Sequence, residues 1–86
     1  MQPGHDTPRQ IREALKEVGN LAVDVGSLSD TDDLYDAGLT SLNTVNLMLA
    51  IEDCFECEFP EEMLNRETFQ SISTIGDALR QLLQAS

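Results

Sequence analysis

The stretch DAGLTSLNTVNLMLAIEDCF, residues 36–55, decides the fold and is the first place to look for function. Gly38 permits the positive φ that a tight turn often needs. Either Thr40 or Ser41 can cap a helix by accepting a hydrogen bond from a first-turn amide. An apolar-rich sequence without proline or glycine follows. The stretch therefore predicts a turn that leads into a helix, with Ser41 beside the positive end of the helix dipole.

Two stripes of mainly apolar side chains run along this predicted helix. At about 100° per residue, one stripe consists of Leu47, Met48, Ile51 and Phe55. The adjacent stripe consists of Leu42, Val45, Leu49 and Glu52. Because one apolar face is enough to dock a helix in a small bundle, we assign the first stripe to the core and predict that the second faces a partner.

The longer stretch DAGLTSLNTVNLMLAIEDCFECEFP resembles the modification-site helix of acyl and peptidyl carrier proteins. In that family the serine of an Asp-Ser-Leu or similar tripeptide carries a covalent phosphopantetheine arm, whose thiol holds the cargo as a thioester. The matching residue is Ser41. Thr40 departs from the commonest tripeptide, which keeps the attachment site but weakens the case for a growing fatty acid as cargo. Phe59-Pro60 and a last amphipathic helix beginning near Ser73 or Thr74 extend the resemblance over most of the chain.

The resemblance implies an all-α fold, a small acyl-carrier-like bundle with three main helices and one short helix. It also implies a freestanding carrier that receives phosphopantetheine from coenzyme A through a phosphopantetheinyl transferase. An acyl- or aminoacyl-loading ligase and downstream transferases would be its partners. The run FPEEMLNRETFQSI is similar to small bacterial carriers loaded by ligases related to seryl-tRNA synthetases, so an aminoacyl cargo is the alternative to an acyl one. An unmodified helical protein-interaction module is a further alternative.

The charge of the chain favours basic protein surfaces as partners. The formal net charge is −11, and no Lys or Arg occurs from residue 24 to residue 62. Such a chain repels phosphate backbones and anionic lipids, so we expect neither nucleic acid nor membrane as a partner. The predicted partner-binding residues are Leu42, Val45, Leu49, Glu52, Asp53 and Glu56.

Length and composition indicate one small domain. Eighty-six residues allow a single modest core. Residues 1–6 lack an apolar period and are expected to be a flexible tail, with the carrier domain over residues 7–86. No apolar run approaches the roughly 20 residues of a membrane span, and the N-terminus lacks a secretory signal. We therefore expect a cytoplasmic monomer.

Local signals place the remaining elements. A first helix is predicted with Thr7 as its cap, Pro8 at its first position and Gly19-Asn20 as its stop. Residues 21–40 are predicted to form a long ordered loop. A short helix or turn is expected between residues 60 and 70, followed by a helix that a Thr74–Asp77 capping box begins.

Catalysis and metal binding are not expected. A nucleophilic serine needs a base within hydrogen-bonding reach, but the only histidine is His5 and the span around Ser41 has no lysine. Cys54 and Cys57 lie near the end of the predicted helix among acidic residues, where the field opposes a thiolate, so reduced thiols with one partly packed are expected. Four ligands for a zinc site are lacking, and the spacing after Asp30 does not fit a calcium loop.

Overall fold

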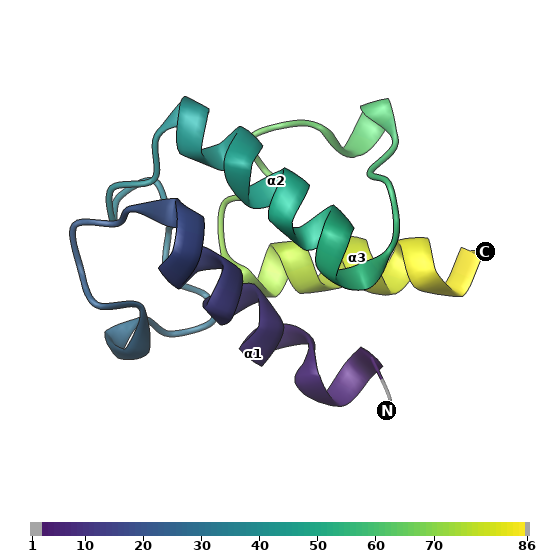
Figure 1. Cartoon of the computed structure of the whole chain (residues 1–86), viewed down its shortest axis with the longest axis horizontal. Helices are drawn as coiled ribbons and strands as arrows, with labels where there is room; N and C mark the ends of the chain where they lie inside the picture. The colour runs from purple at the N-terminus through teal and green to yellow at the C-terminus, as the bar shows by residue number, and fades with distance from the viewer. Residues whose placement is uncertain (1–2, 86) are drawn as a thin grey trace.

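The computed structural model describes residues 3–85, and the side chains of residues 7–84. Its α-helices are α1 (Pro3–Ala14), α2 (Ser41–Phe55) and α3 (Ile72–Ala85) (Figure 1). Three short helical segments accompany them: η1 (Leu15–Gly19), η2 (Val25–Ser27) and η3 (Glu61–Met63). No strand occurs within residues 3–85, which confirms the all-α fold. The expected short fourth helix is the single 3₁₀ turn of η3, so the described chain is a bundle of three α-helices.

The first helix begins earlier than its sequence signals predicted. α1 starts at Pro3, and Pro8 lies inside it rather than at its first position. Proline removes one backbone hydrogen bond but keeps a φ that suits a helix, so the helix can continue through it. Residues 3–6 thus belong to α1, although their flexibility in solution stays a prediction. At the other end Asn20 has a left-handed φ of 50°, which confirms the predicted stop.

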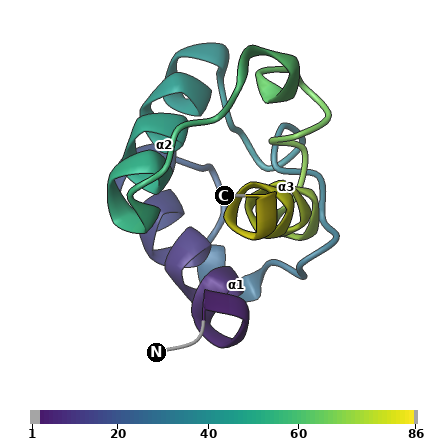
Figure 2. The same cartoon turned by 90° about the vertical axis from the view of Figure 1, so that its right-hand side faces the viewer.

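The core lies where the three α-helices meet. α1 contacts both α2 and α3. Viewed along α3 in Figure 2, α1 and α2 lie on one side, and the segment that joins them passes around the other side of α3. The largest fully buried side chains are Ile11, Leu15, Leu34, Leu47, Ile51, Ile72, Ile75 and Leu79. None of the helices within the described residues is long and apolar enough to cross a membrane.

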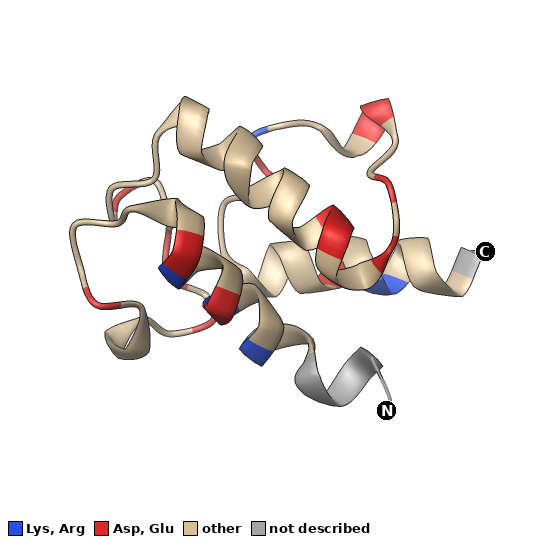
Figure 3. Ribbon diagram, in the orientation of Figure 1, with Lys and Arg blue, Asp and Glu red and all other residues tan. Residues whose placement is uncertain are grey.

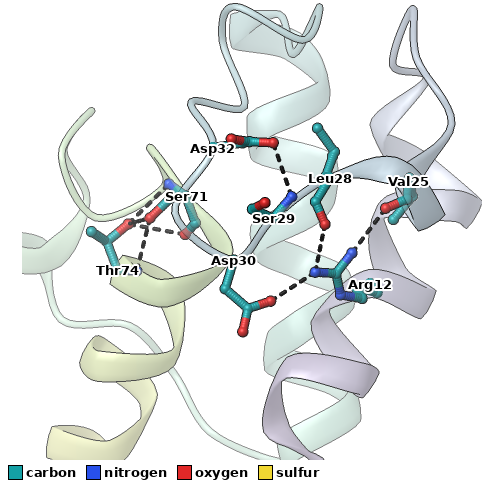
Figure 4. A network of polar contacts seen from close by, with 8 residues as sticks. All are labelled: Arg12, Val25, Leu28, Ser29, Asp30, Asp32, Ser71 and Thr74. Carbon is teal, nitrogen blue, oxygen red and sulfur yellow. Dashed lines mark hydrogen bonds and ion pairs between the residues drawn. The ribbon is translucent and has the colours of Figure 1, made fainter.

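The long loop between α1 and α2 is tied down by one arginine. The Arg12 guanidinium donates from α1 to the carbonyl oxygens of Val25 and Leu28, both at 2.8 Å (Figure 4). It also forms an ion pair with Asp30 at 2.7 Å. The Asp30 carbonyl in turn accepts a hydrogen bond of 2.8 Å from the Ser73 amide at the start of α3. Arg12 therefore ties the loop to α1 through three contacts, as its planar fork of five donors allows, and Asp30 ties the same loop to α3.

The capping box of the last helix lies three residues before its predicted position. The Ser71 hydroxyl accepts from the Thr74 amide at 3.1 Å, and the Thr74 hydroxyl accepts from the Ser71 amide at 3.0 Å. This reciprocal pair satisfies two donors at the beginning of α3. Asp77, predicted as the partner of Thr74, instead pairs with Arg80 at 2.8 Å on the exposed side of α3.

The segment between α2 and α3 is fixed at both ends. After α2, Glu56 has a left-handed φ of 53°, and the Phe59 amide donates to the Glu52 carboxylate at 2.8 Å. Phe59 and Phe69 pack edge to face with ring centroids 5.4 Å apart. These contacts hold residues 59–69 against the bundle, so that part of this segment lies alongside α2.

Candidate attachment site at the start of the second helix

The turn before α2 requires glycine at residue 38. Gly38 has a φ of +113°, which side-chain-bearing residues rarely adopt. A Cβ added there would lie 2.9 Å from the backbone nitrogen of Ala22. That nitrogen donates a 2.9 Å hydrogen bond to the carbonyl oxygen of Ala37. The crossing of the two backbone segments therefore fixes the point from which α2 starts.

Thr40, rather than Ser41, caps the helix. The Thr40 hydroxyl accepts a hydrogen bond of 3.1 Å from the Asn43 amide, and the Thr40 carbonyl accepts one of 2.7 Å from the Thr44 hydroxyl. Ser41 is the first residue of α2, and its side chain is exposed. No hydrogen bond to its hydroxyl occurs among the side chains of residues 7–84. The sequence did not decide which of these two residues caps the helix. In the structure Thr40 is the cap, so the Ser41 hydroxyl is not used for capping.

A mainly apolar groove opens beside Ser41. Its volume is about 370 Å³, and it lies between α2 and the segment that follows residue 63. Its lining residues are Tyr35, Ser41, Thr44, Val45, Met48, Leu64, Asn65, Arg66 and Phe69. None of these is a histidine, lysine or carboxylate that could serve as a general base for the serine.

One arginine at this groove was not singled out from the sequence. Arg66 is the only Lys or Arg from residue 17 to residue 79. Its guanidinium carbon lies 4.0 Å from the centre of the Tyr35 ring, a cation–π distance. The Tyr35 hydroxyl donates to the Arg66 carbonyl at 3.3 Å. A lone cation in a long acidic span is the sequence signal that could have identified it.

The second stripe of α2 is exposed. Leu42, Val45 and Leu49 are 72%, 50% and 53% exposed. Asp53 and Glu56 are also exposed, at the C-terminal end of α2, where Figure 3 shows the acidic residues of this helix gathered. Glu52 differs because it is half-buried and its carboxylate accepts a hydrogen bond from the Phe59 amide. The structure thus brings five of the six predicted partner-binding residues to the surface, and their role stays a prediction.

The two cysteines are free and differ in burial. Cys54 is exposed, whereas Cys57 is half-buried against the core. Burial, followed by the negative charge of Glu52, raises the pKa of the Cys57 thiol above its ordinary value. The direction agrees with a field that opposes a thiolate at this end of α2. Within the described residues, no three or more His, Cys, Asp and Glu side chains gather as a metal site.

The site as a whole fits a covalently attached flexible arm. The Ser41 hydroxyl is exposed and takes no part in capping α2, and the apolar groove beside it has room for an amphipathic chain. Arg66 adds one positive charge at the same groove, which suits an anionic group near the attached end. An all-α bundle with an exposed serine at the start of its second long helix is the arrangement expected of a carrier protein.

Comparison with known proteins agrees with this class. Residues 9–82 match the family described as "Phosphopantetheine attachment site", and the chain belongs to this family. It is 47% identical over 73 residues to the aminoacyl carrier protein of Agrobacterium fabrum (strain C58 / ATCC 33970), covering 85% of this chain and 88% of the relative. The protein is therefore a carrier protein, and its prosthetic group is phosphopantetheine.

Solved structures of carrier proteins with ligases are similar to this chain. One is an engineered Bradyrhizobium japonicum glycine:[carrier protein] ligase complexed with a carrier protein from Agrobacterium tumefaciens and ATP. The match has a TM-score of 0.85 and 44% identity, and covers 87% of this chain and 97% of the other. Another is the Bradyrhizobium japonicum ligase complexed with glycylated carrier protein. That match has a TM-score of 0.73 and 30% identity, and covers 84% of this chain and 96% of the other.

Proposed function

We propose that Ser41 carries the phosphopantetheine arm and that the arm holds an aminoacyl group as a thioester. The observation that carries this proposal is the placement of Ser41. It is exposed at the first position of α2, its hydroxyl is not needed for capping because Thr40 supplies the cap, and an apolar groove opens beside it. When bound, the arm supplies a thiol that forms the thioester, while the chain positions that thiol and presents it to other proteins.

An aminoacyl cargo is supported by the relatives. The relative from Agrobacterium fabrum is named an aminoacyl carrier protein. Two structural neighbours are complexes of a glycine:[carrier protein] ligase, one of them with a glycylated carrier. We therefore take glycine as the first amino acid to test and a ligase of this type as the loading partner. A fatty-acyl cargo is the competing outcome.

The exposed stripe and acidic end of α2 are the proposed docking surface, defined by Leu42, Val45, Leu49, Glu52, Asp53 and Glu56. An anion near a helix C-terminus opposes the helix dipole, so Asp53 and Glu56 do not lie there to stabilise α2. Their placement supports a role in binding a partner with Lys and Arg on its surface.

The same features support a non-catalytic protein of the cytoplasm. The groove contains no general base for Ser41, so transfer to and from the arm is assigned to the partner enzymes. Cys54 and Cys57 are free, as is usual in a reducing compartment.

Attachment is tested by intact-mass measurement after incubation with a phosphopantetheinyl transferase and coenzyme A. The wild-type chain should gain the mass of one phosphopantetheine, and Ser41→Ala should gain none while keeping its helical circular dichroism. Ser29→Ala is the matched control, because Ser29 is also exposed, and it should be modified normally. Modification of Ser41→Ala would contradict the assignment, and refusal by the wild type would favour an unmodified interaction module.

Loading is tested on the modified protein. Incubation with glycine, ATP and a glycine:[carrier protein] ligase should add the mass of one glycyl group, which hydroxylamine should remove because it cleaves thioesters. Parallel reactions with other amino acids define specificity. Loading by a fatty-acyl transferase or ligase, with none by any aminoacyl ligase, would replace the aminoacyl cargo with an acyl one.

A further inference from the structure

We infer that Arg66, supported by the ring of Tyr35, binds the phosphodiester through which the arm is attached. This inference rests on the proposed attachment at Ser41 and assigns a second residue to that site. The phosphodiester formed on the serine oxygen carries one negative charge next to α2. Arg66 and Ser41 line the same groove, so the cation and the attachment point open onto a shared space.

The charge distribution leaves Arg66 as the cation available at this place. Of the five basic residues in the chain, Arg9, Arg12 and Lys16 precede residue 17 and Arg80 lies on α3. Arg12 and Arg80 are engaged by Asp30 and Asp77. Among the described residues no carboxylate forms an ion pair with Arg66, although the chain has 16 acidic residues. In so acidic a protein, an arginine kept free of carboxylates at the groove can accept an external anion.

Tyr35 orients this arginine. The Arg66 guanidinium lies over the Tyr35 ring at 4.0 Å. The Tyr35 hydroxyl also donates a hydrogen bond of 3.3 Å to the backbone carbonyl of Arg66. Stacking restricts the guanidinium plane while its N–H donors at the edge stay available, and a planar fork can bind two phosphate oxygens at once. The amides in the first turn of α2 add a favourable field for the same anion.

Phosphorus NMR of the modified protein tests the inference directly. The phosphodiester resonance should differ from that of the same modified protein unfolded in denaturant, and in Arg66→Gln it should move toward the unfolded value. Arg80→Gln removes the same charge from an exposed arginine outside the groove, and it should leave the resonance unchanged. Since an exposed ion pair contributes modestly, the bound population should fall roughly two- to fivefold in Arg66→Gln.

Two further measurements separate a charge effect from a change of structure. Arg66→Lys should restore part of the shift, because it keeps the charge but loses the planar fork. In the wild type, added salt should move the resonance in the same direction as Arg66→Gln, because exposed charges are screened over about 8 Å at physiological ionic strength. The salt titration needs no substitution and therefore decides the question even if a variant folds poorly.

The outcomes distinguish this inference from the proposed function. If intact mass shows no modification of the wild type, both fail. If Ser41 is modified but the phosphorus resonance is the same in the wild type and Arg66→Gln at all salt concentrations, Arg66 does not bind the phosphodiester and the proposed function stands. A normal resonance with slower modification of Arg66→Gln would likewise overturn the inference and assign Arg66 to partner binding.

Discussion

The two faces of α2 have similar side chains but opposite surroundings. Leu47 and Ile51 are fully buried between the helices, while Leu42 and Leu49 are 72% and 53% exposed. Burial of an aliphatic side chain contributes roughly 1.5–3 kcal/mol to folding, and the exposed leucines forgo most of that stabilisation. The comparison teaches that hydrophobicity on one helix can serve two purposes. The buried face holds the bundle together, and the exposed face is surface that the fold itself does not use.

The largest expected effect is on the buried face. Ile51→Ala removes a fully buried side chain and leaves a cavity, so it should lower the free energy of unfolding by roughly 2–5 kcal/mol. Leu49→Ala is the matched control two residues away, on the exposed face of the same helix, and should lower it by less than about 1 kcal/mol. Denaturant melts measure both values. If Leu49→Ala is the more unfolded of the two, the faces have been assigned the wrong way round.

The exposed face should show its effect in loading instead. Leu49→Ala on the modified protein should slow loading by the ligase roughly tenfold, because we expect Leu49 to be one of the few central residues whose truncation costs more than about 1 kcal/mol. Steady-state kcat/KM for the loading reaction is the measurement. Val23→Ala, which truncates another exposed apolar residue outside α2, should load at the wild-type rate, and an equal loss there would point to a non-specific effect.

At the acidic end of α2, stability and loading should change in opposite directions. Asp53→Asn removes an exposed anion from the last turn, so it should raise the free energy of unfolding by about 0.3–1 kcal/mol. The same change should slow loading and weaken its dependence on salt. Melts and salt-titrated loading rates test both parts, with Glu13→Gln on α1 as the charge-matched control. A faster loading rate for Asp53→Asn would contradict electrostatic recognition.

The smallest expected effect concerns the reactivity of two thiols at the C-terminal end of α2, Cys54 in its last turn and Cys57 just after it. Cys54 is exposed and Cys57 is half-buried with a raised pKa, so iodoacetamide should alkylate Cys54 first at neutral pH. Because the folded-state pKa of Cys57 is raised, its contribution to stability is present at low pH and is lost as the pH rises through that value. Peptide mass spectrometry over time measures the order of labelling. Earlier labelling of Cys57 would show that this end of α2 opens more readily than the core contacts indicate.

Much of α2 could be predicted from sequence because its information is local. A period of 3.6 residues separates Leu47 and Ile51 from Leu42 and Leu49, and the full burial of Leu47 and Ile51 confirms this part of the predicted core stripe. Its other members, Met48 and Phe55, are half-buried and pack against the core. The sequence also indicated that Gly38 permits the positive φ of a tight turn, and its φ of +113° confirms such a turn. These features depend on backbone geometry and on spacing within a few residues.

Other parts could not be predicted because they depend on contacts between distant residues. No local pattern singles out Arg12, because its partners lie 13–18 residues away in the loop. Arg66 meets Tyr35 across 31 positions of sequence. The start of α3 shows a local error instead: Thr74–Asp77 was predicted as the capping box, but Ser71 and Thr74 form it. The two pairs have the same spacing of three residues, so spacing alone does not distinguish them.

Thr40 caps α2 and Ser41 does not, and this has a consequence for the unmodified chain before the arm is added. The Asn43 amide already has its acceptor in Thr40, so a substituent on Ser41 breaks no hydrogen bond of the helix. Adding the arm should therefore not weaken the helix, and binding of its phosphodiester by Arg66 would stabilise the folded state modestly. Because α2 is capped before any arm is added, we expect freshly synthesised chains to fold and to resist proteases before they meet their transferase.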